Sequence, residues 1–352
     1  MKVVYVGMRY DYGDPRRGDC YEYRTFLPSL RNMPGVQVDH FPYDEILRSE
    51  GRRRMNQRLQ AMAGQKPDLF FFVLYSDEIF PETIQWLTRH SGAVTVNWFG
   101  DDQWRFEVFS RFRAHLFTWC VTTDEHAVAR YRAVGVANVI HSQWGFNHHE
   151  AEESAVDEDI DVSFVGQAHP GRKRLMSTLR SRGLRVETWG RGWENGPLSQ
   201  REMVEVFKRT KVNLNFTGSV AGWNLRGIAK IALSRRADGT YTIRSPREIM
   251  PASRLLFSRP RAQIKGRNFE IPGHGGFLLT SAADGLDRYY VPGKEIAVWN
   301  DPRELVEKVH YYLAHDAERK HVKEEGRRRT LAEHTYEQRF RHLFRTMGLG
   351  DF

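Results

Sequence analysis

One run of the sequence, 263–280, brings cations, a carboxylate and glycines close together. It reads QIKGRNFEIPGHGGFLLT, with Lys265 and Arg267 before Glu270, and Gly273 and Gly275 after it. Two cations suit a diphosphate, because Arg can donate two parallel hydrogen bonds to an anion. A carboxylate can accept hydrogen bonds from a ribose diol, and glycines let the backbone approach a ligand closely. The same residues also fit an ordinary helix end with surface charges, so the run by itself leaves both interpretations open.

A second pair of cations, Arg172 and Lys173, opens a predicted helix at 171–182. Cations are disfavoured at the N-terminus of a helix unless an anion neutralises them, because the helix dipole is positive there. A bound phosphate would remove this conflict. The alternative is a solvated helix start with no ligand.

Asp101 and Asp102 lie in NWFGDDQW, at the carboxyl end of a predicted strand at 93–99. Open α/β sheets bind their ligands at this edge. Either carboxylate could serve as the base for an acceptor hydroxyl, and adjacent carboxylates raise the pKa of one of the two. The competing interpretation is that one of them caps the next helix.

The loop after the first predicted strand contains Arg9, Gly13 and Asp14. Its position at the carboxyl end of that strand predicts either a segment that closes over a ligand or a plain surface loop.

Several familiar sites are excluded by their missing motifs. The first strand is not followed by G-x-G-x-x-G, and no P-loop or H-E-x-x-H motif occurs. Two cysteines, Cys20 and Cys120, cannot form a disulfide framework or a multi-cysteine zinc site. We therefore expect no metal, no bound cofactor and a reducing, cytoplasmic location.

Short apolar runs alternate with longer amphipathic ones along the chain, which predicts parallel sheets with crossover helices. FFFVLY and VTVNWF are nearly continuous apolar runs, as expected of strands buried on both faces. The predicted strands are 2–8, 36–42, 68–75, 93–99, 116–122 and 138–143, and then 161–166, 184–189, 212–217, 277–280 and 295–299.

This pattern predicts an α/β protein of two Rossmann-like domains, 1–149 and 162–335. Between them lies an acidic stretch, 150–161, which reads as an exposed linker because it has seven acids and no Lys or Arg. Residues 317–348 are predicted to be helical. Their last part, within 336–352, is expected to pack on the first domain through a stripe of Tyr336, Phe340, Leu343, Phe344 and Met347.

The segment 219–262 breaks the alternation and is strongly basic. It contains nine Lys or Arg residues and two acids, so it carries +7 of the whole chain's net charge of +9. We consider it an insertion in the second domain. It is either a lid or docking surface for an anionic acceptor (a phosphorylated glycan, a lipid head group or DNA) or a solvated flap without a partner.

The overall composition limits the class of protein. In 352 residues the aromatic content is 12%, which argues against disorder. The sequence contains no apolar run near the ~20 residues that a transmembrane helix needs.

The second half resembles the group-1-like glycosyltransferases of the spore-maturation (CgeB-like) type. The resemblance rests on the run 263–280 and on five further motifs. These are DVSFVGQ (161–167), ETWGRGW (187–193), EMVEVFKRTKVNLNF (202–216), GKEIAVWNDPRELVEKVHYYLAHD (293–316) and LAEHTYEQRF (331–340). It implies a GT-B fold, with two Rossmann-like domains facing across a cleft and a last helix that crosses back to the first domain.

The resemblance also implies an activity and residue roles. The enzyme would move a sugar from a nucleotide diphosphate sugar, UDP- or GDP-linked, to an acceptor hydroxyl without a metal. Glu270 would match the family's ribose-binding glutamate, and Arg172 and Lys173 its diphosphate contacts. A second glutamate of related enzymes, eight residues earlier, is Ala262 here. The alternative function is DNA or anion binding, or DNA glycosylation, on the same scaffold through the basic insertion.

Overall fold

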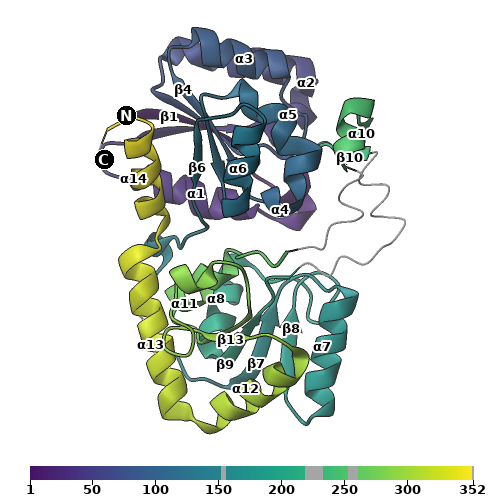
Figure 1. The fold of residues 1–352 in the computed structure, drawn as a ribbon, viewed down its shortest axis with the longest axis vertical. Coiled ribbons are helices and arrows are strands. Elements are labelled where there is room, and N and C mark those ends of the chain that lie inside the picture. The colour runs from purple at the N-terminus through teal and green to yellow at the C-terminus, as the bar shows by residue number, and fades with distance from the viewer. Residues whose placement is uncertain (152–155, 219–232, 253–260, 351–352) are drawn as a thin grey trace. The chain divides into compact units, whose positions relative to one another are not determined.

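The computed structural model describes residues 1–151, 156–218, 233–252 and 261–350. These residues form two compact units (Figure 1). The first unit comprises 1–143, the described part of 222–259, and the chain from Tyr336 onward. The second comprises the described residues of 144–221 and of 260–335.

The first unit is built on a parallel sheet in the order β2-β1-β3-β4-β5-β6. The six strands predicted for this half are confirmed in order, because each apolar run forms one. Leu69–Phe72, which includes the first three residues of FFFVLY, is fully buried. The strands are β1 Lys2–Gly7, β2 Gln37–Pro42, β3 Leu69–Phe72, β4 Val94–Phe99, β5 Trp119–Thr122 and β6 Val139–His141.

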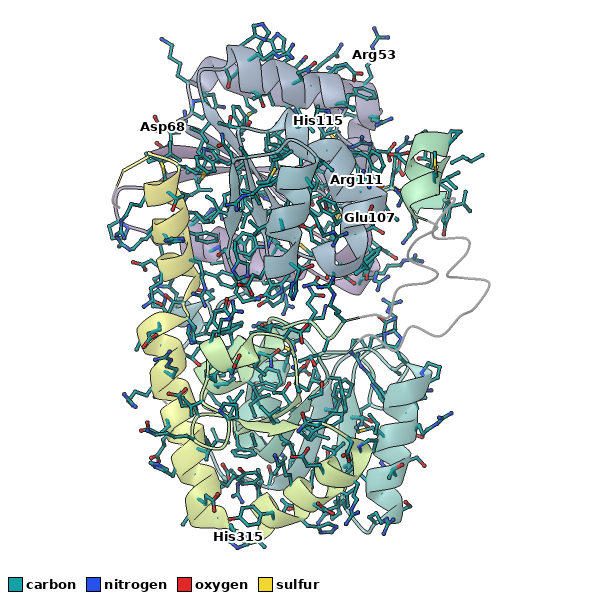
Figure 2. All side chains as sticks on the ribbon, viewed as in Figure 1. Arg53, Asp68, Glu107, Arg111, His115 and His315 are labelled. Atoms are coloured by element: carbon teal, nitrogen blue, oxygen red, sulfur yellow. The ribbon has the colours of Figure 1, made fainter. Side chains whose placement is uncertain are left out.

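The helices of the first unit connect these strands. They are α1 Tyr21–Arg31, α2 Tyr43–Ala61, α3 Pro81–His90, α4 Asp102–Arg105, α5 Arg111–Arg113 and α6 Glu125–Ala133. A π-helical turn at Phe106–Ser110 joins α4 to α5. Its Glu107 pairs with Arg111 at 2.6 Å and with Arg130 at 2.9 Å; Figure 2 labels the first of these pairs.

The second unit has a five-stranded parallel sheet in the order β13-β12-β9-β7-β8. All five strands predicted for this half are present. They are β7 Ile160–Val165, β8 Val186–Trp189, β9 Thr210–Asn215, β12 Leu278–Ser281 and β13 Ala297–Trp299. The helices are α7 Pro170–Ser181, α8 Gln200–Arg209, α11 Arg267–Gly273, α12 Pro302–Ala314 and α13 Asp316–Glu333.

The predicted C-terminal helix is two helices. It is interrupted at His334 and Thr335, where the backbone N–H of Phe146 donates to the carbonyl of His334 at 2.9 Å. The second piece, α14 (Tyr336–Thr346), packs against α1, and the hydroxyls of Tyr21 and Tyr336 lie 2.9 Å apart. The predicted apolar stripe of α14 is buried in this contact.

The predicted boundary and the acidic linker need correction. Contacts divide the chain at 143 and 144, and Ile160 already lies in β7. Two acids among the described residues of this stretch, Glu158 and Asp159, pair with cations of the second unit. Glu158 pairs with Arg319 at 2.8 Å, and Asp159 pairs with Arg209.

The basic insertion also differs from the prediction, because its described residues 233–252 belong to the first unit. They form a hairpin, β10 (Leu233–Arg235) and β11 (Tyr241–Ile243), followed by α10 (Pro246–Ala252). Residues 219–232 and 253–260 of the insertion lie outside the described part of the chain. Among the described helices, none is long and apolar enough to span a membrane.

Candidate functional site

In the second unit, Arg172 lies at the carboxyl ends of β7 and β9. Its guanidinium carbon is 5.3 Å from the centre of the Phe164 ring and 5.9 Å from that of Phe216. Its Nη1 donates to the carbonyl of Gln167 at 2.9 Å. Burial lowers the pKa of Arg172, because its charge is partly removed from water. The structure thus holds a half-buried cation at the sheet edge where α/β proteins bind ligands.

Lys173 is exposed on the next position of α7. Its Nζ lies 6.0 Å from the ring centre of Trp193, whose Nε1 donates to the carbonyl of Gly166 at 2.8 Å. Gly166 directly follows β7, so Lys173 lies at the same edge of the sheet as Arg172.

Lys265 reaches this edge from the other side of β9. The backbone N–H of Gln263 donates to the carbonyl of Thr217, two residues beyond β9, at 2.9 Å, and Lys265 Nζ donates to the Gln263 side chain. The backbone N–H of Lys265 donates to Asn268 at 2.9 Å, which fixes the start of α11. Three of the predicted donor cations therefore lie at the carboxyl ends of β7 and its neighbour β9.

Arg267 and Glu270 are placed differently. They form an ion pair with each other on α11, one helical turn apart. The Glu270 side chain is only 3% exposed and that of Arg267 is 24% exposed, with its guanidinium 5.5 Å from the Phe207 ring centre. Burial also lowers the pKa of the neighbouring His274 to about 4, so this imidazole is neutral at pH 7.

The structure of the second unit requires glycine at both Gly273 and Gly275. A Cβ on Gly273 would lie 2.4 Å from the Phe146 ring. Gly275 has a φ of +77°, a left-handed conformation that ends α11 and favours glycine. Packing and helix termination therefore account for both residues.

In the first unit, Asp102 is fully buried. Its Oδ2 accepts hydrogen bonds from the hydroxyls of Thr122 and Tyr131, both at 2.7 Å. Burial raises the pKa of Asp102 to about 6, although these hydrogen bonds oppose the rise. A carboxyl enclosed in this way has no surface to offer an acceptor hydroxyl, so the geometry favours a structural role for Asp102.

Asp101 is partly exposed at the N-cap position of α4, and its side chain makes no capping hydrogen bond there. It lies close enough to Glu22, in the first turn of α1, to raise the pKa of that carboxyl after the larger effect of burial. Glu22 is not among the predicted site residues, because a glutamate in the first turn of a helix is also the ordinary choice for the helix dipole. Its position at the carboxyl end of β1 was the available signal.

The loop after β1 is held by contacts within the first unit. Arg9 pairs with Glu45 at 3.3 Å, and Asp14 accepts hydrogen bonds from Arg16, which lower the pKa of Asp14 to about 2. Gly13 is buried, and a Cβ there would lie 2.2 Å from the carbonyl oxygen of Ala237. The predicted acceptor loop thus packs directly against the hairpin of the basic insertion.

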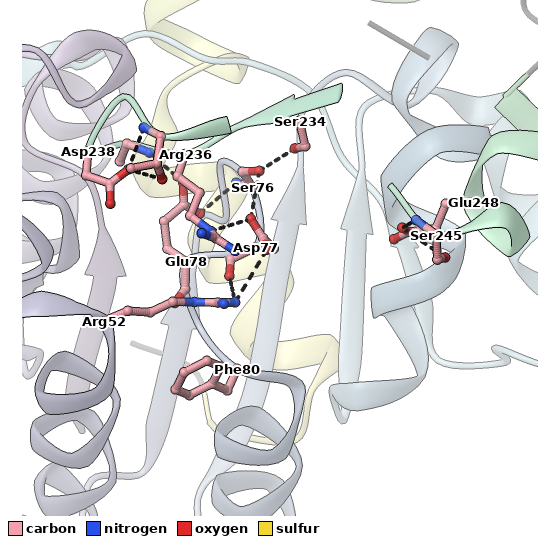
Figure 3. Close-up of polar contacts among 12 residues, drawn as sticks. Arg52, Ser76, Asp77, Glu78, Phe80, Ser234, Arg236, Asp238, Ser245 and Glu248 are labelled. Atoms are coloured by element: carbon pink, nitrogen blue, oxygen red, sulfur yellow. Dashed lines mark hydrogen bonds and ion pairs between the residues drawn. The ribbon is translucent and has the colours of Figure 1, made fainter. Parts of the chain in front are cut away.

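A polar clasp, formed by Ser76, Asp77 and Glu78 after β3, fastens this hairpin (Figure 3). Arg236 donates to both carboxylate oxygens of Asp77, at 2.9 and 2.7 Å. Glu78 is fully buried and accepts hydrogen bonds from the backbone N–H groups of Ser76 at 2.8 Å and Ala237 at 2.9 Å. Burial raises the pKa of Glu78 to about 7.

Comparison with known proteins identifies the fold. A comparison with the sequences of curated proteins finds no significant match. Residues 172–345 match the model of a family described as glycosyl transferase-like.

Solved structures match the chain over nearly its whole length. A sucrose-phosphate synthase from Thermosynechococcus elongatus matches with a TM-score of 0.60 at 12% identity, covering 99% of both chains. Anabaena HepE in complex with UDP-glucose matches with a TM-score of 0.57 at 10% identity, also covering 99% of both chains. A glycosyltransferase from Rickettsia africae matches with a TM-score of 0.54 at 7% identity, covering 99% of this chain and 98% of the other. The chain therefore has the GT-B fold of two parallel-sheet Rossmann-like domains, and its second half is similar to the glycosyl transferase-like family.

Proposed function

We propose that this protein is a glycosyltransferase that moves a sugar from a nucleotide diphosphate sugar to an acceptor hydroxyl. The second unit would bind the donor. The observation that carries this proposal is the gathering of Arg172, Lys173 and Lys265 at one edge of its sheet. UDP-glucose is the first donor to test, because the similar HepE structure holds it. The resemblance to the spore-maturation type stays a prediction.

The three cations would act on the leaving group. When the bond to the sugar breaks, negative charge grows on the diphosphate, and fixed positive charges stabilise that state more than the ground state. Arg172 is suited to this role because its guanidinium group lies beside the Phe164 and Phe216 rings, which limits its freedom before any ligand binds. With these charges in place, we propose transfer that does not depend on a metal ion.

Glu270 would bind the ribose, and Arg267 would hold its carboxylate until the ligand arrives. The ion pair orients the Glu270 carboxylate, which would accept hydrogen bonds from the ribose hydroxyls. Because Glu270 has so little exposed surface, this contact requires the Arg267 side chain to move aside.

The first unit would bind the acceptor. Asp101 is the proposed base, since it is partly exposed at the carboxyl end of β4 and Glu22 lies near it. We place the reaction in the cytoplasm, in keeping with Cys20 and Cys120, which are free thiols.

The test is release of UDP from UDP-glucose by the purified protein, with and without EDTA, together with melting temperatures in UDP-, GDP-, ADP- and dTDP-sugars. A donor at a hundredfold excess over Kd stabilises the fold by ~2.7 kcal/mol. We expect the sugars of one nucleotide to raise the melting temperature. We also expect the protein to release UDP slowly, and this release to continue in EDTA. No thermal response to any nucleotide would contradict the proposal.

A further inference from the structure

The two faces of the β10–β11 hairpin have opposite environments. In its register Leu233 lies across from Ile243, Arg235 across from Tyr241, and Ser234 across from Thr242. Since side chains alternate along a strand, the first two pairs share one face and Ser234 and Thr242 share the other.

The face with Ser234 is turned toward the first unit and fixed there. The Ser234 hydroxyl lies 2.6 Å from that of Ser76, and Arg236 is held by Asp77 (Figure 3). Ala237, at the turn, is buried with the core of the first unit. With this face anchored, the hairpin presents its other face outward.

The outward face is unusually apolar. Tyr241 is 68% exposed and Ile243 is 77% exposed, and Met250 on the following helix is 73% exposed. These are the three most exposed large hydrophobic side chains in the described parts of the chain, and they lie within ten residues. A concentration of exposed apolar groups marks an interaction surface, because it costs free energy in water.

A cation on this face favours one kind of partner. Arg235 lies directly across from Tyr241 on the hairpin, and the described residues 233–252 contain four Arg and two acids. Aromatic and aliphatic side chains beside cations suit the interface of an anionic bilayer, where the apolar groups enter and the cations meet phosphate. Nucleic acid would use the cations but leave Ile243 and Met250 in water. A stable protein interface needs about 20–30 residues on each side. The outward face of the segment 233–252 offers only about half of its 20 residues, which is too few.

We propose that the outward face of the β10–β11 hairpin docks the protein on the surface of an anionic lipid bilayer. Tyr241 and Ile243 enter the interfacial region, and Arg235 binds head-group phosphate. This inference does not depend on the proposed glycosyl transfer.

The test is cosedimentation of the full chain, without donor, with vesicles of phosphatidylcholine alone or mixed with phosphatidylglycerol. We expect binding to the mixed vesicles only, weakened by salt. The double variant Tyr241→Ser/Ile243→Ser should lose at least tenfold in affinity. The matched control, Val291→Ser/Tyr311→Ser, removes two exposed side chains of the same kinds from the second unit and should bind like the unaltered protein.

Three results would overturn the proposal. One is equal binding to both vesicle types or to neither. The second is unchanged binding by the Tyr241→Ser/Ile243→Ser variant once its melting temperature shows that it is folded. The third is that the same variant instead loses affinity for duplex DNA, or changes from dimer to monomer, while vesicle binding stays constant.

Discussion

Arg267 donates to the carboxylate of Glu270 one turn further along α11. From the sequence these residues were expected to bind different parts of a ligand, and in the structure they bind each other. An ion pair with one nearly buried partner holds both side chains in place, and removing either leaves a charge that is poorly solvated.

The first prediction concerns Glu270→Gln. If the carboxylate binds a ribose, this variant should weaken UDP binding by about ten- to a hundredfold, the range for a lost hydrogen bond to a charged group. The measurement is isothermal titration calorimetry. Glu307→Gln is the matched control, because Glu307 pairs with Arg303 on the surface of α12 at 2.9 Å. Equal UDP affinity in both variants would mean that Glu270 only stabilises α11 through its ion pair with Arg267.

The second prediction concerns Arg172→Met, which keeps an unbranched apolar side chain over Phe164 and Phe216 but removes the charge. UDP affinity should fall by about ten- to a hundredfold, while uridine affinity should stay constant because uridine has no diphosphate. Arg174→Met, two positions along α7 and exposed, is the control and should change neither value. A parallel loss for uridine would contradict a diphosphate contact.

The third prediction separates the two adjacent aspartates. Asp102→Ala should lower the free energy of unfolding by about 2–4 kcal/mol, because the hydroxyls of Thr122 and Tyr131 lose their acceptor. Asp101→Ala should leave stability within about 0.5 kcal/mol, as for other surface changes, but lower kcat by about 10²–10⁴-fold if it is the base. Urea denaturation and turnover of the two variants give the answer. Normal turnover by a folded Asp101→Ala protein would remove Asp101 as the base.

The fourth prediction concerns the clasp. Arg236→Ala removes both hydrogen bonds to Asp77. We therefore expect faster amide exchange in 233–243, beginning with the backbone N–H of Ala237, which donates a hydrogen bond to Glu78. The cost should be about 1–2 kcal/mol for a half-buried bidentate pair. Arg303→Ala, in the exposed pair on α12, should leave exchange in the hairpin unchanged.

The fifth prediction is a pH dependence set by Glu78. Its pKa in the folded protein is raised to about 7, so the folded state holds a proton that the unfolded chain has already released near pH 5. Stability is therefore lost as pH rises from about 4.5 to about 7, by up to about 3 kcal/mol. The unfolding free energy of the unaltered protein minus that of Glu78→Gln should fall between pH 5 and pH 8, because only the unaltered protein loses this contribution. A constant difference would show that Glu78 is ionised throughout.

Much of the fold could be predicted from the sequence. Each strand of the two parallel sheets followed from a short apolar run, because parallel strands buried on both faces need continuous apolar side chains. The stripe on α14 likewise predicted a buried face, and Tyr336 packs against Tyr21 and Phe26 of α1. These signals are local, because the buried face of a helix recurs at every turn and a buried strand is apolar along its whole length.

The candidate site followed only in part. The sequence placed Arg172 at the start of a predicted helix and Lys265 in the run 263–280, and only the parallel sheet of the second unit brought them to one edge. Which of Asp101 and Asp102 is enclosed depended on Thr122 and Tyr131, which are distant in the sequence.

The basic insertion shows the limit most clearly. Its charge was plain in the sequence, yet its hairpin joined the first unit through Asp77, Glu78 and Gly13, which precede it by more than 150 residues. Residue type and local spacing determined the elements and the kinds of chemistry available. Tertiary structure alone decided which charges were paired, buried or left exposed, because each of those outcomes depends on partners that chain folding brings from far away.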